Sequence, residues 1–269
     1  MDICNTGGTV DALPAFKEMN DPLMLSSSAF DRTSAAARNL LQRHKIASQR
    51  AMCNQAVNNV RLIEPIPYMI NVISETVQRL EDAEWCNLKV PDVTVDMNEV
   101  IFGESVTGTI VYKNGFVVAI QHVDILQHSL GQQWRFDRVQ NTTTVEVTGT
   151  LRFTDVTIGF DVETKIEGTV KMYTAELLVP LVTFDMRVIR DMFTENINVT
   201  VTPININRNR VKMDFLPVDN LTDVFSNLFN FDSISEAANV WASDFIRPFA
   251  LNAVENVVDY PEICYDCPV

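Results

Sequence analysis

The chain has 269 residues, of which 46% are hydrophobic, and its 35 acidic and 21 basic residues give a formal net charge of −14. Such an acidic surface repels the phosphates of nucleic acids and of anionic bilayers, so we expect no nucleic-acid partner. No uninterrupted apolar run approaches the roughly 18 to 20 residues that cross a membrane. We therefore expect no integral membrane association and one elongated domain with a large apolar core.

Several features bear on the compartment. Triplets that accept N-linked glycans begin at Asn141, Asn198 and Asn220, which fits a secreted glycoprotein. The first residues, MDICNTGGTVDALPAF, carry neither the basic nor the apolar segment of a secretory signal. Either a signal was removed before this numbering begins or none existed, and we expect secretion with the signal removed. Five cysteines suffice for two disulfides and one leftover thiol. They are Cys4, Cys53, Cys86, Cys264 and Cys267.

The N-terminal third divides into three segments. Residues 1–27 are rich in Gly, Asp, Pro and Ser without periodicity, which predicts an extended arm. From about Ser28 to Leu62 a broken apolar stripe predicts a helix. Over 66–84 apolar residues recur every three and four positions, which predicts the clearest amphipathic helix of the chain.

From Trp85 to about Phe215 the apolar period changes to two, which predicts strand after strand of an antiparallel sheet. The similar segments VTGTI, VTGTL and IEGTV, at 106–110, 147–151 and 166–170, each place a glycine at a strand position. Glycine tolerates bulges and sharp bends in strands, so the repeat predicts strong curvature. The alternative is chance repetition in a sheet rich in Thr and Val.

Two turns are expected within these strands. A three-residue loop at 113–115 would make a hairpin in which Ile110 lies opposite Val118. A tight turn at 154–155 would bring one apolar row to a common face. That row contains Val147, Leu151, Phe153, Val156, Ile158 and Val162.

After Pro217 the helical period returns in two segments, 221–229 and 238–249, and Pro248 is expected to kink the second. The segment FSNLFNF at 225–231 and the later stripe of Trp and Phe are more often core than ligand site. Their quantity favours a second interpretation. A curved sheet facing equally apolar helices encloses either a thick core or a cavity for a hydrophobic molecule.

Candidate catalytic groups are sparse. The histidines are His44, His122 and His128, and they lie on separate predicted elements. His122 and Asp124 would share a strand face, where we favour a solvated surface over a metal or acid–base pair, so no metal is predicted. The CYDC segment at 264–267 has the spacing of half a zinc site or a redox pair, but a terminal disulfide is favoured. No phosphate loop, nucleophile elbow or HExxH motif occurs, so we expect neither an enzyme nor a cofactor beyond a bound lipid or isoprenoid.

Between about residues 54 and 258 the chain resembles the group 7 mite allergens and their arthropod relatives. These belong to the tubular lipid-binding superfamily with the takeout, juvenile-hormone-binding and bactericidal permeability-increasing proteins. The resemblance rests on the 66–84 helix leading into KVPD at 89–92, on VTGTIVYKNGFVVAI and VTGTLRFTDVTIGFDV, and on the closing helix rich in Phe and Trp. It implies an α+β super-roll, in which a curved antiparallel sheet wraps around long amphipathic helices, and a hydrophobic ligand.

The sequence thus predicts a secreted protein that binds or transports a fatty acid, sterol, terpenoid or carotenoid-like molecule in an apolar cavity. The chain would divide into an arm (1–27), one lipid-binding domain (28–262) and a cysteine-containing tail (263–269). The alternative is a structural, storage or allergen-like interaction protein whose roll is filled by its own side chains. The oligomeric state, including a homo-oligomer, stays open. The expected lining is Ile70, Ile73, Val77, Ile110, Val118, Leu151, Phe153, Ile158, Phe160, Trp241 and Phe245.

Overall fold

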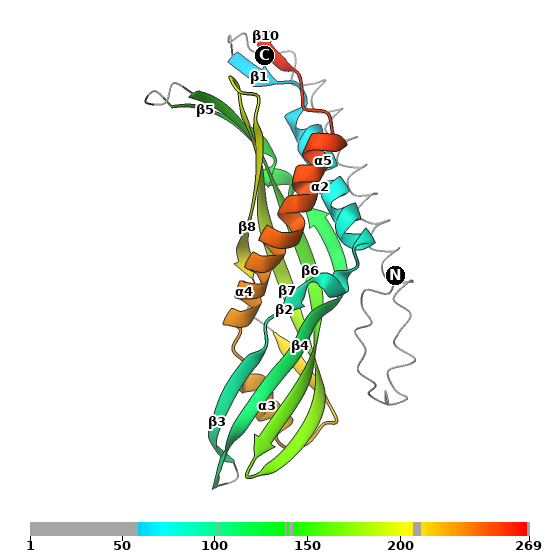
Figure 1. The fold of residues 1–269 in the computed structure, drawn as a ribbon, viewed down its shortest axis with the longest axis vertical. Coiled ribbons are helices and arrows are strands. Elements are labelled where there is room, and N and C mark those ends of the chain that lie inside the picture. Colours follow the sequence, from blue (N-terminus) through cyan, green and yellow to red (C-terminus); the bar gives the residue numbers. More distant parts are fainter. Residues whose placement is uncertain (1–58, 102, 138, 140–141, 207–210, 268–269) are drawn as a thin grey trace.

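The structure is a computed structural model that describes residues 59–267 except 102, 138, 140–141 and 207–210. It is an elongated α+β molecule in which one long, curved antiparallel sheet carries helices along one face (Figure 1). The predicted fold class is confirmed. Alternating β-branched residues build the sheet and three- and four-residue spacing builds the helices, as the two periods require.

Three strands that are longer than usual form the centre of the eight-stranded sheet. They are β4 (Glu104–Ile125), β6 (Thr142–Ile166) and β7 (Thr169–Asp191). Shorter strands complete its edges and ends, in the order β2-β4-β6-β7-β8, with β3 on β4, β5 on β6 and β9 on β7. Their bounds are β2 (Lys89–Val90), β3 (Val93–Ile101), β5 (Gly131–Asp137), β8 (Ile197–Ile206) and β9 (Lys212–Leu216).

The two turns expected inside these strands are wrong. Residues 113–115 lie within β4, which continues through a β-bulge: Lys113 pairs with Asp161 and Phe116 with Gly159. Residues 154–155 lie within β6, where Asp155 has a φ of 53° and stays outside the ladder with β7. Irregular positions inside a strand and tight turns both favour residues such as Asn, Asp and Gly with positive φ. The local sequence therefore does not distinguish a continuing strand from a turn.

These irregular positions decide which side chains face the interior, because each one shifts the alternation of its strand by one position. In β4 the bulge turns Val117 inward and leaves Val118 53% exposed, so the prediction that Val118 lines the interior is wrong. In β6 the inward alternation shifts by one position at Asp155 while the register with β7 stays the same on both sides, so the predicted apolar row keeps to one face. Its members Val147, Leu151, Phe153, Val156, Ile158 and Val162 are all fully buried.

Of the three glycines in the repeated segments, two lie inside strands, Gly108 in β4 and Gly149 in β6. The third, Gly168, does not. It has a φ of 78° and forms the two-residue turn with Glu167 that joins β6 to β7. The tight β6–β7 hairpin therefore lies at 167–168, as expected for left-handed residues at a two-residue turn.

The helices follow the predicted pattern with one exception. Helix α2 (Pro65–Asp82) is the predicted amphipathic helix. Of the helix expected from about Ser28 to Leu62, the last residues instead form β1 (Asn59–Leu62), which pairs with β10 (Ile263–Cys267), and the rest lies outside the described residues.

Near the C-terminus come α3 (Thr222–Leu228), α4 (Asp232–Val240), a π-helical segment (Trp241–Ile246) and α5 (Arg247–Asn256). The chain stays helical through Pro248. The wider π-helical turn precedes this proline, which has no N–H to donate to the preceding turn.

The helices divide the interior into two halves. In the upper half of Figure 1, α2 and α5 pack together and contact β5, β6 and β8. In the lower half, α3 packs against β9. Helix α4 lies between them and contacts β2 and β8.

Candidate functional site

The predicted lining residues are mostly interior residues of one apolar core. All except Val118 and Phe245 are 2% exposed or less, and Phe245 is half-buried against the core. Phe160 packs against Phe229 in the lower half, whereas Ile70, Ile73 and Val77 belong to α2 in the upper half. Their joint lining of one cavity stays a prediction.

The upper half is enclosed by α2 and α5 on one side and by strands β5 to β8 on the other. Every apolar side chain that α2 turns inward, from Met69 to Leu80, is buried. The opposite wall consists of Val145 and Val147 of β6 with Met186 and Val188 of β7, all fully buried. Both walls of this half are therefore apolar along most of their length.

Aromatic rings occupy the boundary between the halves. Phe153 packs edge-to-face against Trp85 at 5.9 Å and against Phe184 at 5.4 Å. The indole Nε1 of Trp241 donates a hydrogen bond of 2.7 Å to the Lys89 carbonyl oxygen. This bond ties the helical layer to β2 and satisfies the one polar atom of a fully buried side chain.

The lower half is filled by aromatic side chains. Phe229, which follows α3, packs against Tyr112 at 4.9 Å and Phe160 at 5.5 Å. Phe225 of α3 packs against Tyr173 and Phe215, and its carbonyl oxygen accepts a 2.8 Å hydrogen bond from the Tyr112 hydroxyl. The phenylalanines of the FSNLFNF segment thus pack in the core, which is the more common of the two roles considered for this segment, core and ligand site.

At the upper end of the interior the character changes, because three polar side chains meet there. Tyr68 comes from the first turn of α2, Arg190 from the end of β7, and Tyr260 from the segment between α5 and β10. The two tyrosine rings lie 5.4 Å apart, and the Arg190 guanidinium carbon lies 4.5 Å from the centre of the Tyr260 ring. We call these three residues the upper polar cluster.

The upper polar cluster is short of hydrogen-bond partners. The Tyr68 hydroxyl, the Tyr260 hydroxyl and the Arg190 Nε are shielded from solvent and have no hydrogen-bond partner among the residues that the structure describes. The Trp134 Nε1 shares this condition, and Trp134 lies on the same row as Arg190, since both residues pair with Val145 of β6. These residues are far apart in the sequence, so no local pattern indicated them.

Burial also controls ionisation in the upper polar cluster. It raises the pKa of the Tyr68 phenol well above its usual range, and Tyr260 adds to this rise while the Arg190 charge opposes it. Burial raises the pKa of Tyr260 to about 12, again against the Arg190 charge. Both phenols therefore keep their protons at neutral pH and can act as hydrogen-bond donors.

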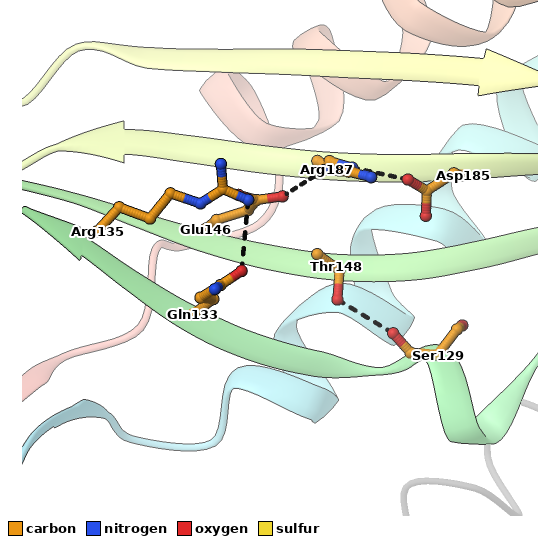
Figure 2. Close-up of polar contacts among 7 residues, drawn as sticks. All are labelled: Ser129, Gln133, Arg135, Glu146, Thr148, Asp185 and Arg187. Atoms are coloured by element: carbon orange, nitrogen blue, oxygen red, sulfur yellow. Dashed lines mark hydrogen bonds and ion pairs between the residues drawn. The ribbon is translucent and has the colours of Figure 1, made fainter.

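The opposite face of the same strands carries a charge network that is internally satisfied. Glu146 of β6, 5% exposed, lies 3.0 Å from the guanidinium groups of both Arg135 and Arg187, and Arg187 also binds Asp185 at 2.7 Å. Figure 2 shows these side chains on the side of the sheet away from the helices. Two cations and two anions balance, so this network leaves no group to recruit a ligand.

The candidate catalytic groups do not assemble into a site. His122 and His128 are exposed, and His44 lies outside the described residues. Asp124, which shares a face with His122, is held by Arg152 at 2.7 Å. Among the described residues, no three His, Cys, Asp or Glu side chains are placed to hold a metal ion.

Cys86 and Cys264 each take part in a disulfide bond, whereas Cys4, Cys53 and the Cys267 side chain lie outside the described part of the structure. Of the glycosylation triplets, Asn198 and Asn220 are exposed and Asn141 is not described. Within the described ranges, no helix has the length and apolar character needed to span a membrane.

Comparisons with known proteins assign the chain to no family. No protein-family model matches the chain, and no curated protein matches it. A crystal structure of lipopolysaccharide binding protein is similar to this chain with a TM-score of 0.41 and 10% sequence identity. The similarity covers 75% of this chain and 41% of the other, so the chain spans less than half of that protein. Assignment to the arthropod allergens or takeout proteins stays a prediction.

Proposed function

We propose that this protein binds a hydrophobic small molecule in the upper half of its interior, between α2 and α5 and strands β5 to β8. The observation that carries the proposal is the apolar character of both walls there, combined with unpartnered polar groups at one end. Apolar walls favour a ligand that leaves water, at about 25 cal/mol for each Å² of apolar surface buried. A few polar groups at one end of an apolar site fix the orientation of a ligand.

The helical cover supports the same proposal. Side chains make most of the contact between this cover and the sheet, with hydrogen bonds such as the 2.9 Å bond from Arg247 Nε to the Val199 carbonyl oxygen. Two elements held by side-chain packing can separate and close again at a smaller cost in free energy than two paired strands. Separated strands would leave their backbone N–H and C=O groups in need of new hydrogen-bond partners. A ligand can therefore enter between the helices and the sheet while the sheet stays intact.

A second candidate function is the filled roll of a structural or interaction protein. The aromatic packing of the lower half favours it, because Phe225 and Phe229 occupy the space that a ligand would need there. The two candidates differ in what the upper half contains.

Adjacent residues of β7 offer a matched test. Val188 is fully buried on the inner face, and Ile189 lies on the outer face. We expect Val188→Trp to abolish binding of palmitate, a long-chain probe, with little change in melting temperature, because the indole would occupy ligand space. The Ile189→Trp control should bind as the wild type does. If Val188→Trp instead unfolds the protein and the wild type binds no palmitate, the upper half is a solid core and the filled roll is the better proposal.

Secretion, the division into arm, domain and tail, and glycosylation also remain proposals. The exposure of Asn198 and Asn220 supports glycosylation, since an acceptor asparagine must be accessible. Intact mass before and after glycosidase treatment, on protein made in a eukaryotic secretory host, tests it. We also propose that the protein binds its ligand without catalysing a reaction, because its histidines lie on separate elements.

A further inference from the structure

The upper polar cluster, together with Trp134 on the same row, has more unpartnered hydrogen-bond donors than acceptors among the described residues. Arg190 Nε and Trp134 Nε1 can only donate, and the Tyr68 and Tyr260 hydroxyls are both protonated. A buried donor without a partner costs about 1–3 kcal/mol, so native proteins rarely keep several together without a use for them. Within the described part of the chain, the missing component is therefore an acceptor.

The charge of this cluster indicates the kind of acceptor. The carboxylate beside Arg190 is that of Glu195, at 3.6 Å from its Nη2, and Glu195 is 77% exposed and thus largely hydrated. The Arg190 side chain is only 20% exposed. An exposed partner at this distance compensates a buried guanidinium weakly. A negatively charged group with two oxygens would satisfy the charge and the donors together.

We propose that Arg190, Tyr68 and Tyr260 bind the carboxylate of an amphiphilic ligand whose hydrocarbon part lies in the upper interior. This proposal rests on the proposed function and specifies its ligand as a long-chain carboxylic acid. One guanidinium matches the single charge of a carboxylate, and the two phenols add donors to it. Val188 and Val147, both fully buried, continue the same inner face from Arg190 toward the middle of the sheet and would contact the chain.

Helix α2 positions one donor of the site, since Tyr68 lies in the first turn of this 18-residue helix. The N-cap residue of α2 is Glu64, and Pro65 and Pro67 have no N–H to donate, so the helix end itself adds little to the binding of an anion. The proposal therefore depends on the three side chains.

A buried water molecule, or stacking of Arg190 on Tyr260 for purely structural reasons, would account for the same cluster without a ligand. The alternatives predict opposite effects of removing a hydroxyl. If a water binds the Tyr68 hydroxyl, Tyr68→Phe lowers the melting temperature of the ligand-free protein. If the hydroxyl waits for a ligand, the same variant leaves that temperature unchanged or raises it, because an unpaired buried group has been removed.

The experiment measures melting temperature and affinity together for Tyr68→Phe, Tyr260→Phe, Arg190→Gln and the control Tyr112→Phe. The probes are palmitate, methyl palmitate and acetate, each added to delipidated protein. Tyr112 is a matched control, because its buried hydroxyl does have a partner, the Phe225 carbonyl oxygen in the lower half. Tyr112→Phe should lower the melting temperature and leave palmitate affinity unchanged.

We expect the wild type to bind palmitate at least tenfold more tightly than methyl palmitate, and each variant of the cluster to weaken palmitate binding about tenfold or more. Binding of methyl palmitate should not change in these variants. Acetate should not compete at concentrations that saturate with palmitate, because it lacks the apolar chain.

Three results would overturn the proposal. Equal binding of palmitate and its ester, unaffected by the variants, would reject the carboxylate site and leave the hydrophobic-ligand function in place. Competition by acetate at similar concentration would indicate an isolated anion site without an amphiphile. Failure of both long-chain probes to bind the wild type would reject the proposed function and this site with it.

Discussion

Ile73 of α2 packs directly over Gly149 of β6, so that a β-carbon built on Gly149 would lie 2.9 Å from the Ile73 Cδ1. The Met69 Cγ would be equally close. Both helical side chains are fully buried and cannot move without displacing their neighbours. The missing side chain at Gly149 therefore sets how closely α2 approaches the sheet.

We predict that Gly149→Ala lowers the free energy of unfolding by about 1–3 kcal/mol, through overpacking against α2. Gly131→Ala is the control, because the nearest atom to its added carbon, the Thr148 Oγ1, is 3.9 Å away. Urea unfolding of both variants measures the difference. Equal stabilities would mean that α2 does not rest on Gly149.

The buried carboxylate on the outer face provides a second prediction. Glu146→Gln removes the negative charge that holds Arg135 and Arg187. We expect a loss of about 1–2 kcal/mol, below the usual cost of breaking a fully buried pair because both arginines are partly exposed. In the control, Glu75→Gln breaks the half-exposed pair with Arg79 on α2 and should cost no more than about 0.5 kcal/mol. A cost for Glu146→Gln as small as that of the control would contradict the assigned burial.

Glu81 near the end of α2 makes stability depend on pH. Burial, with a smaller contribution from Asp82, raises the pKa of Glu81 from 4.5 to about 7, and its Oε1 is buried with no hydrogen-bond partner in the described ranges. Its contribution to stability is therefore full below pH 4.5 and is lost as the pH rises through about 7, because the unfolded chain ionises first.

Replacing Glu81 by Gln should therefore stabilise the protein at about pH 8, by on the order of 1–2 kcal/mol, and have little effect at about pH 4. Thermal unfolding at the two pH values measures this, with Glu236→Gln on the exposed face of α4 as the control. A variant equally stabilised at both pH values would show that the effect does not come from ionisation.

The disulfides give a prediction about connectivity. Cys86 follows the C-terminal end of α2, whereas Cys264 pairs with Arg61 of β1, which precedes the other end of that helix. An 18-residue helix is about 27 Å long, and disulfides need Cα atoms within about 7 Å. We predict that Cys86 and Cys264 are not bonded to each other, and that each is bonded to one of Cys4, Cys53 and Cys267. Non-reducing peptide mapping that recovers a Cys86–Cys264 peptide would contradict the placement of both.

The sequence predicted the elements better than their connections. The apolar stripe from Ile66 to Leu80 was sufficient to predict α2, because the spacing that makes a helix amphipathic is visible within one short segment. Alternation likewise predicted the strands, but Asn114 and Asp155 have a left-handed backbone that occurs both at irregular strand positions and in turns. Only the ladder with neighbouring strands decides between these, and that ladder is a long-range property.

From the sequence, only the apolar character of the candidate site could be predicted, not its position or its polar residues. Ile70, Ile73 and Val77 are interior residues, as their spacing indicates. The split of the interior into two halves depends on where α3 and α5 return to the sheet, which no local pattern specifies. Tyr68, Arg190 and Tyr260 meet across nearly 200 residues of chain, and each looks ordinary in its own segment.

The central claim is that the upper interior holds the chain of a hydrophobic molecule, and its most direct test is calorimetric titration of delipidated protein with saturated fatty acids of increasing length. Each added methylene that enters the interior contributes about 0.8 kcal/mol. We therefore predict an affinity that rises about fourfold per carbon until the chain fills the site, with one molecule bound per protein. An affinity independent of chain length, or no binding at any length, would contradict the account.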